Sequence, residues 1–186
     1  MSSISQTPGP ASSLPRFGFG PRFALSMVAV AGLVGLSMRG ALDPVVRMAA
    51  TARPHLPDVA LFASQSPAVK IHLLAALAAL GLGAVLMLAR KGRVFHRVAG
   101  WVWVVLVAAT AGASIFITEL NNGHWSLLHL ITGWVLLVTP MAVIWARRHD
   151  VARHRRTMMG LFYGGFAINV FVAFIPGRLL WNLILG

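Results

Sequence analysis

Cysteine is absent from the 186 residues of this chain, which excludes disulfides, thiolate metal sites and covalent c-type haem attachment. Acidic side chains are scarce as well, with four Asp and Glu against sixteen Lys and Arg. No nucleophile–base pair, acidic cluster, phosphate-binding loop or HExxH segment occurs. An acid–base hydrolase is therefore disfavoured, no catalytic residue is assigned, and the residues leave open whether the protein is an enzyme.

Charge of either sign is low and apolar residues dominate. Charged residues make up 11% of the chain, against about 25% in soluble domains, while 58% of residues are hydrophobic and mean hydropathy is +0.77. Apolar runs of about 20 residues, long enough to cross a bilayer core of ~30 Å, recur along the chain. We predict an all-α, polytopic membrane protein with five transmembrane helices, at about 23–38, 68–89, 98–118, 125–146 and 157–175.

The remaining segments complete the predicted domain organisation. Residues 1–20, rich in Ser, Pro and Gly, are predicted to be a disordered cytoplasmic tail, and residues 21–186 a single transmembrane domain. No Ala-x-Ala cleavage site directly follows the 23–38 run, which favours a retained first helix over a signal peptide. After Asp43-Pro44, residues 45–52 are predicted to form a short helix at the membrane interface.

The basic residues predict the orientation in the membrane. The net charge of +12 lies in short loops beside apolar runs, so topology and anionic lipid headgroups explain it better than nucleic acid does. Connections 90–97 and 147–156 carry nine Lys and Arg, whereas 119–124 carries none and contains Glu119. The positive-inside rule places both basic loops in the cytoplasm of a bacterial inner membrane, with the N-terminus cytoplasmic and the C-terminus periplasmic. The 39–70 connection, outside in this scheme, is an exception with four Lys and Arg.

Four histidines recur at matching positions in two apolar hairpins. His72 and His129 each open an apolar run that reaches an Ala-Arg pair 17 and 18 residues later. His96 and His154 each precede an arginine and follow the first histidine of their hairpin by 24 and 25 residues. We predict that the last four spans form a duplicated two-hairpin bundle. His72 and His129 would lie level near its outer side, and His96 and His154 level near its inner side.

Each histidine pair is predicted to bind a b-type haem, because neutral imidazole is a common axial ligand of haem iron. Ala76, Gly100 and Gly133 follow three of these histidines by one turn and would leave room for a flat porphyrin. Small residues equally suit close helix packing, and span-end histidines also lie among headgroups or bind other metals. The loop histidines His55, His124 and His149 are interpreted as solvated, and Asn169 as a residue that forms a helix–helix hydrogen bond.

Residues 70–180 resemble a family of bacterial predicted inner-membrane proteins known only as a domain of unknown function. The resemblance is carried by Ile71-His72, Phe95-His96-Arg97 with Gly100, Leu128-His129, His154-Arg155-Arg156 with Met158, and Pro176-Gly177-Arg178. More distantly, the chain is similar to cytochrome b561 and related di-haem reductases. That resemblance implies one haem between spans 2 and 4 and another between spans 3 and 5. The histidines here lie closer to the span ends than in that family.

The function predicted first is a b-type haem or quinone-linked electron-transfer subunit, with the lipid bilayer and other membrane protein subunits as partners. The alternative is a cofactor-free structural or assembly subunit of a larger membrane complex. A transporter ranks third, because Asn169 is the main polar residue at depth. No metal beyond haem iron and no nucleic-acid partner is predicted.

Overall fold

The computed structural model describes residues 42–118 and 128–186, together with Val28. Those residues form helices, turns and loops, with no strand, which confirms the all-α class. The predicted 1–20 tail, Glu119, His124 and all of the 23–38 span except Val28 lie outside the described residues. The chain divides into two compact units, residues 1–39 and 40–186, and both long described stretches belong to the second unit.

Three long helices correspond to predicted spans 2 to 4. These are α4 (Pro67–Leu88), α5 (Val94–Ser114) and α6 (Leu128–Arg147), and each is long and apolar enough to cross a membrane. The start of α4 follows from its sequence, since Ser66 Oγ accepts the N–H of Val69 and Pro67 stands in the first turn, where no N–H is needed. The count of five spans and the duplication of the hairpin stay predictions.

The predicted fifth span lies in a continuous helical run of three parts, α7 (Val151–Gly160), the π-helix η2 (Leu161–Ala167) and α8 (Ile168–Ala173). The run begins earlier than predicted because the Asp150 carboxylate caps it, accepting the N–H of Arg153 at 3.0 Å. Asn169 donates its side-chain N–H to the Gly165 carbonyl. The helix–helix hydrogen bond predicted for Asn169 is therefore wrong, because the wider π-turn offers that amide an acceptor within its own helix.

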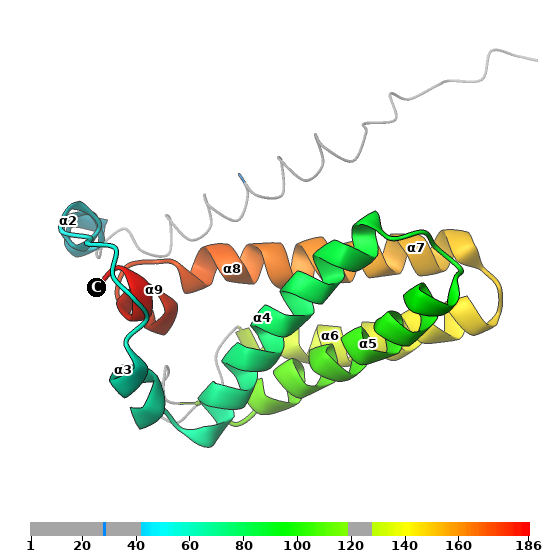
Figure 1. Cartoon of the computed structure of the whole chain (residues 1–186), viewed down its shortest axis with the longest axis horizontal. Coiled ribbons are helices and arrows are strands. Elements are labelled where there is room, and N and C mark those ends of the chain that lie inside the picture. Colours follow the sequence, from blue (N-terminus) through cyan, green and yellow to red (C-terminus); the bar gives the residue numbers. More distant parts are fainter. Residues whose placement is uncertain (1–27, 29–41, 119–127) are drawn as a thin grey trace, which may run out of the picture. The chain divides into compact units, whose positions relative to one another are not determined.

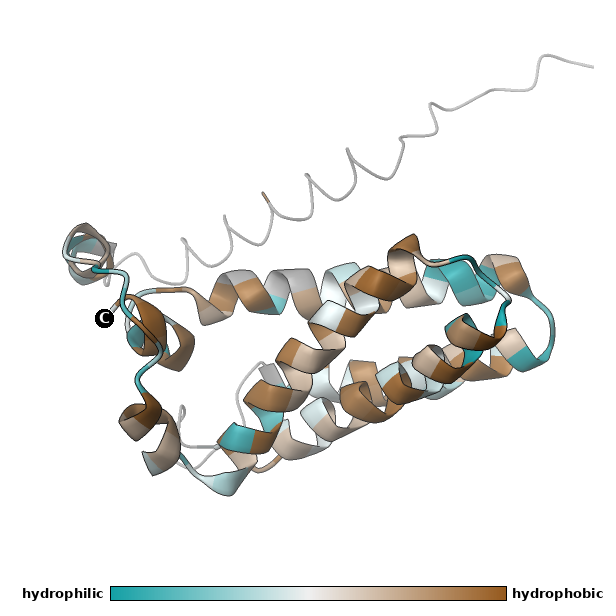
Figure 2. Cartoon of the chain, in the orientation of Figure 1, coloured by the Kyte–Doolittle hydropathy of each residue, from teal (hydrophilic) through white to brown (hydrophobic). Residues whose placement is uncertain are grey.

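The long helices pack in chain order into a four-helix bundle. Helix α4 packs on α5, α5 on α6, and α6 on α7 and η2, and η2 also contacts α4 (Figure 1). Apolar residues run along the length of these helices, whereas hydrophilic residues collect at α7 and the connecting loops (Figure 2). No more than 22% of any of the three candidate spans is buried inside the bundle, so their outer faces suit contact with lipid.

Trp103 and Gly83 lie at a close approach of helices in the core. Trp103 is 2% exposed, and its Nε1–H donates to the Ala79 carbonyl at 2.9 Å. A Cβ at Gly83 would stand 2.5 Å from Phe162 Cε2 and 2.8 Å from Trp103 Nε1. Because neither ring atom lies at the end of a flexible chain, glycine at this position is what lets α4 approach α5 and η2.

Close helix packing was one role that the sequence suggested for Gly100 and Gly133. Neither glycine has a contact of the kind seen at Gly83. A Cβ built at either one meets no atom of the described residues within 4 Å. The close-packing role for these two glycines is therefore wrong. The space beside each of them remains open.

Three short helices accompany the bundle: α2 (Leu42–Ala50), α3 (Val59–Ser64) and α9 (Leu179–Ile184). The short helix predicted over residues 45–52 is confirmed as α2, although it begins before Asp43 rather than after it. Gly177 turns the chain into α9 with φ +86°, a conformation that strongly favours glycine. His55 is exposed but not merely solvated, because its ring nitrogens lie 2.7 Å from the Leu56 oxygen and 3.0 Å from a Gly186 oxygen.

Candidate functional site

His72 and His129 line the same cavity. His72 lies in the second turn of α4 and His129 in the first turn of α6, the two helices that begin at the same end of the bundle. The cavity has a volume of about 350 Å³, within the range of small-molecule and cofactor sites. The fold thus brings the predicted outer pair to one site, with α5, η2, α8 and α9 completing its walls.

The protonation of His72 is set by a neighbouring helix. Its Nδ1 lies 2.9 Å from the backbone oxygen of Thr110 in α5. A carbonyl oxygen only accepts hydrogen bonds, so Nδ1 carries the proton. In the neutral imidazole the lone pair is then on Nε2, and the ring orientation is fixed by the carbonyl, as in histidines that bind metals.

The cavity walls combine small residues with a few polar ones. Ala76, one turn after His72, and Gly165 both line it, and neither has a large side chain that would fill the cavity. Ser114 Oγ and Thr132 Oγ1, 2.7 Å apart, join α5 to α6 at its edge. Arg178, just after the Gly177 turn, is the one cation among the described lining residues.

The predicted inner pair lies at one end of the bundle, with His96 near the start of α5 and His154 near the start of α7. Helix α6 ends there too, where Arg147 contacts Trp101 of α5. His154 Nδ1 lies 2.9 Å from the Ala142 oxygen and so donates to it, which leaves the Nε2 lone pair of the neutral ring free. Within the described part of the chain, the buried Nδ1 of His96 has no hydrogen-bond partner. In each pair, then, one ring is oriented by a backbone carbonyl of another helix.

The separation of the two levels follows from α5, which reaches both. His96 lies near its start, and Thr110, the partner of His72, lies fourteen residues further on. At 1.5 Å per residue the two levels are about 21 Å apart along the helix. Both therefore fit within a bilayer core of ~30 Å.

No ordinary metal site accompanies these histidines in residues 42–118 and 128–186, where no group of three or more His, Asp or Glu could hold an ion. A bis-histidine haem needs only two protein ligands, since the porphyrin supplies the others. The sequence did not reveal the backbone carbonyls of Thr110 and Ala142, because any residue can provide one. Arg178 belongs to the Pro176-Gly177-Arg178 motif that carries the family resemblance, but the sequence did not predict that it would line the cavity.

Comparison with known proteins identifies the family of the chain and nothing more specific. No curated protein sequence and no solved structure matches it. A family model described as "Predicted membrane protein (DUF2306)" matches residues 69–184, from the first turn of α4 to the end of α9. The match spans more than half of the chain and includes all four bundle histidines. The chain belongs to this family of predicted membrane proteins.

Proposed function

We propose that this membrane protein binds b-type haem within its bundle and serves as an electron-transfer subunit. The observation that carries the proposal is the outer cavity, where His72 of α4 and His129 of α6 line one space. The Thr110 carbonyl orients His72 and leaves its Nε2 as a lone-pair donor. A histidine that ligates a metal needs a hydrogen bond of this kind to orient its ring. A histidine among lipid headgroups does not need a fixed tautomer.

The residues that line the cavity suit the group chemically. Two imidazoles from facing helices suit haem iron, and Ala76 and Gly165 leave space for a flat ring. Arg178 would hold a propionate through charge-assisted hydrogen bonds. A bound haem would supply one-electron redox chemistry, for which this chain has no cysteine or metal cluster of its own among the described residues.

His96 and His154 are proposed as the ligands of a second haem at the inner level. Support comes from the buried, unpartnered Nδ1 of His96, since such an atom in a folded protein calls for a missing partner. The His154 ring, oriented by the Ala142 carbonyl, lies at the same end of the bundle. Two haems about 21 Å apart along α5 would span most of the bilayer, and a quinone or another membrane subunit would exchange electrons with them.

A visible absorption spectrum of the purified full chain tests the proposal. From haem-replete cells we expect a reduced-minus-oxidised spectrum with a b-type α-band, and haem extraction should give one or two haems per chain. A colourless protein that is folded by circular dichroism would overturn the proposal. The cofactor-free structural or assembly subunit would then become the leading function.

The orientation proposed for the chain is the one its loop charges favour, in a bacterial inner membrane with a cytoplasmic N-terminus and a periplasmic C-terminus. Because the chain has no cysteine, single cysteines report position cleanly. Leu56, 88% exposed, and Arg93, exposed in a basic loop, lie before and after α4. Leu56→Cys should react with an impermeant maleimide in intact spheroplasts, and Arg93→Cys only after lysis. The reverse pattern would invert the orientation, and equal labelling would mean that α4 does not cross the membrane.

A further inference from the structure

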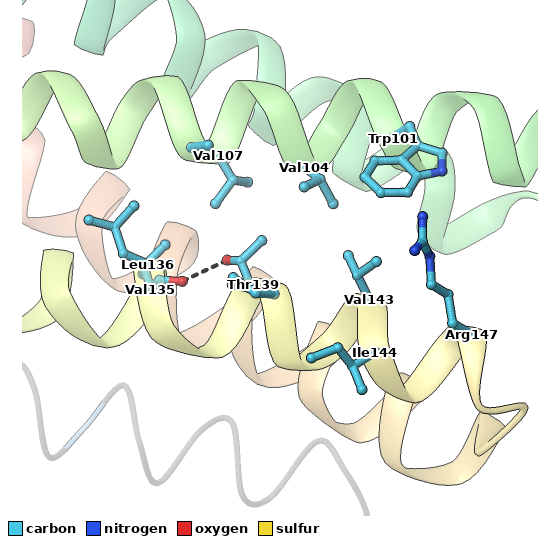
Figure 3. A pocket seen from close by; sticks show the side chains of 11 residues that line it. Trp101, Val104, Val107, Val135, Leu136, Thr139, Val143, Ile144 and Arg147 are labelled. Atoms are coloured by element: carbon cyan, nitrogen blue, oxygen red, sulfur yellow. Dashed lines mark hydrogen bonds between the residues drawn. The ribbon is translucent and has the colours of Figure 1, made fainter.

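A second hollow, the α5–α6 groove, lies between those two helices and has almost entirely apolar walls (Figure 3). It has a volume of about 400 Å³, and its walls include Val104 and Ala108 of α5 with Leu136 and Val143 of α6. Its one hydroxyl, that of Thr139, is already engaged, because Oγ1 donates to the Val135 carbonyl at 2.7 Å. The groove thus suits an aliphatic chain rather than a polar ligand.

One end of the groove is charged. Arg147, the last residue of α6, extends toward Trp101 of α5 (Figure 3), and its Cζ lies 5.7 Å from the indole centroid. This cation–π contact holds the guanidinium beside the indole ring, and the N–H donors of Arg147 form no hydrogen bond with a described residue. In the described parts of the chain, the one salt bridge joins Arg153 to Asp150, and no acidic side chain pairs with Arg147.

The surroundings of Arg147 are strongly positive. The connections 90–97 and 147–156 place nine Lys and Arg at this end of the bundle with one carboxylate, Asp150, and that carboxylate is taken by Arg153. An anion that binds here must therefore come from outside the chain. The anion abundant at this depth of a membrane is a phospholipid headgroup, and basic pockets between helices bind such groups.

We propose that the α5–α6 groove is a specific site for an anionic phospholipid. One acyl chain lies along the Val104, Ala108 and Val143 wall, and the phosphate accepts a forked pair of hydrogen bonds from Arg147 beside Trp101. The site is separate from the histidine cavity, although Val107 and Val135 line both spaces. The proposal does not depend on haem.

The test counts lipids bound to the detergent-solubilised full chain by native mass spectrometry. Phosphatidylglycerol, phosphatidylcholine with the same acyl chains, and inorganic phosphate are added separately. We expect phosphatidylglycerol to bind more tightly than phosphatidylcholine, and Arg147→Gln to weaken that binding about fivefold. Arg148→Gln is the matched control, because Arg148 is the exposed next residue along the chain and lines no part of the groove.

A second pair of variants tests the apolar wall. Ala108→Phe should fill the groove and lower the affinity for phosphatidylglycerol, whereas Ala78→Phe, at an exposed position of α4 outside both cavities, should not. Equal losses for Arg147→Gln and Arg148→Gln would overturn the proposal in favour of diffuse charge. Equal binding of the two lipids would also overturn the proposal, and so would displacement of the lipid by millimolar phosphate alone. An Ala108→Phe variant that melts at a lower temperature but binds lipid as the wild type does would overturn it as well.

Discussion

His72→Ala and His129→Ala should each abolish the same component of the reduced-minus-oxidised haem spectrum. The two rings line one cavity from α4 and α6, so removal of either would leave a bound haem with one protein ligand. We expect the low-spin b-type signal to disappear on loss of one ligand, rather than to shift slightly. Difference spectra and haem extraction on each purified variant measure it.

Rescue of the haem band by added imidazole distinguishes loss of a ligand from misfolding. Added imidazole should restore the lost band in His129→Gly, because the deletion leaves a space the size of the ring, whereas an unfolded bundle would not respond. His149→Asn is the matched control: His149 is exposed and has φ +57°, a conformation that Asn tolerates. If His72→Ala and His129→Ala removed different components, or His149→Asn removed the same one, the outer assignment would be wrong.

The inner pair is expected to behave as a separate unit. His96→Ala and His154→Ala should remove a second component and leave the outer one intact, because the two levels lie about 21 Å apart along α5. Retention of the full spectrum in both variants would restrict haem to the outer cavity.

Gly83→Ala should destabilise the bundle although alanine favours helices by about 1 kcal/mol over glycine. The new methyl group would overlap the rings of Phe162 and Trp103, and the Trp103 ring is held by its hydrogen bond to Ala79. Overpacking of this kind typically costs about 1–3 kcal/mol, which exceeds the gain in helix propensity. Gly83→Leu should lose more. Thermal unfolding in detergent, followed by circular dichroism, measures the change.

Gly81 provides the control two residues away in the same helix. It is exposed, and a Cβ there meets no described atom within 4 Å, so Gly81→Ala should match or slightly exceed the wild-type melting temperature. Gly100→Ala should behave like Gly81→Ala for the same reason. A Gly83→Ala protein that melts with the Gly81 variant would mean that Phe162 and Trp103 can move aside, and that the core is looser than these contacts imply.

Length and hydropathy determine much of this fold independently of any tertiary contact. Helices α4, α5 and α6 are apolar over a bilayer's thickness, a property of composition that holds wherever the helices pack. Ser66-Pro67 marks the start of α4, because capping and the missing proline N–H are local effects. The start of α7 at Val151 was not predicted, because the polar run with three arginines has no apolar periodicity, and the helix there depends on the Asp150 cap and on packing against α6.

The spacing of the histidines predicts their levels in outline. If alternate helices run in opposite directions, the nearly equal spacing in two hairpins would place His72 level with His129, and His96 level with His154. The structure places His72 and His129 on one cavity. Spacing says nothing about which glycine meets a neighbour, however. Gly83 and Gly100 both lie within apolar runs of the sequence. Only the rotation of each helix about its axis places Phe162 and Trp103 against Gly83.

Tertiary structure alone decided what surrounds the histidines. The carbonyls of Thr110 and Ala142 fix the tautomers of His72 and His154, and a backbone oxygen leaves no mark in a sequence. The cation–π contact between Arg147 and Trp101 likewise depends on how α5 and α6 cross. Local residue preferences set where helices begin and which stretches are apolar, but the relative rotation and crossing of helices are set by packing along their whole length, which no single segment encodes.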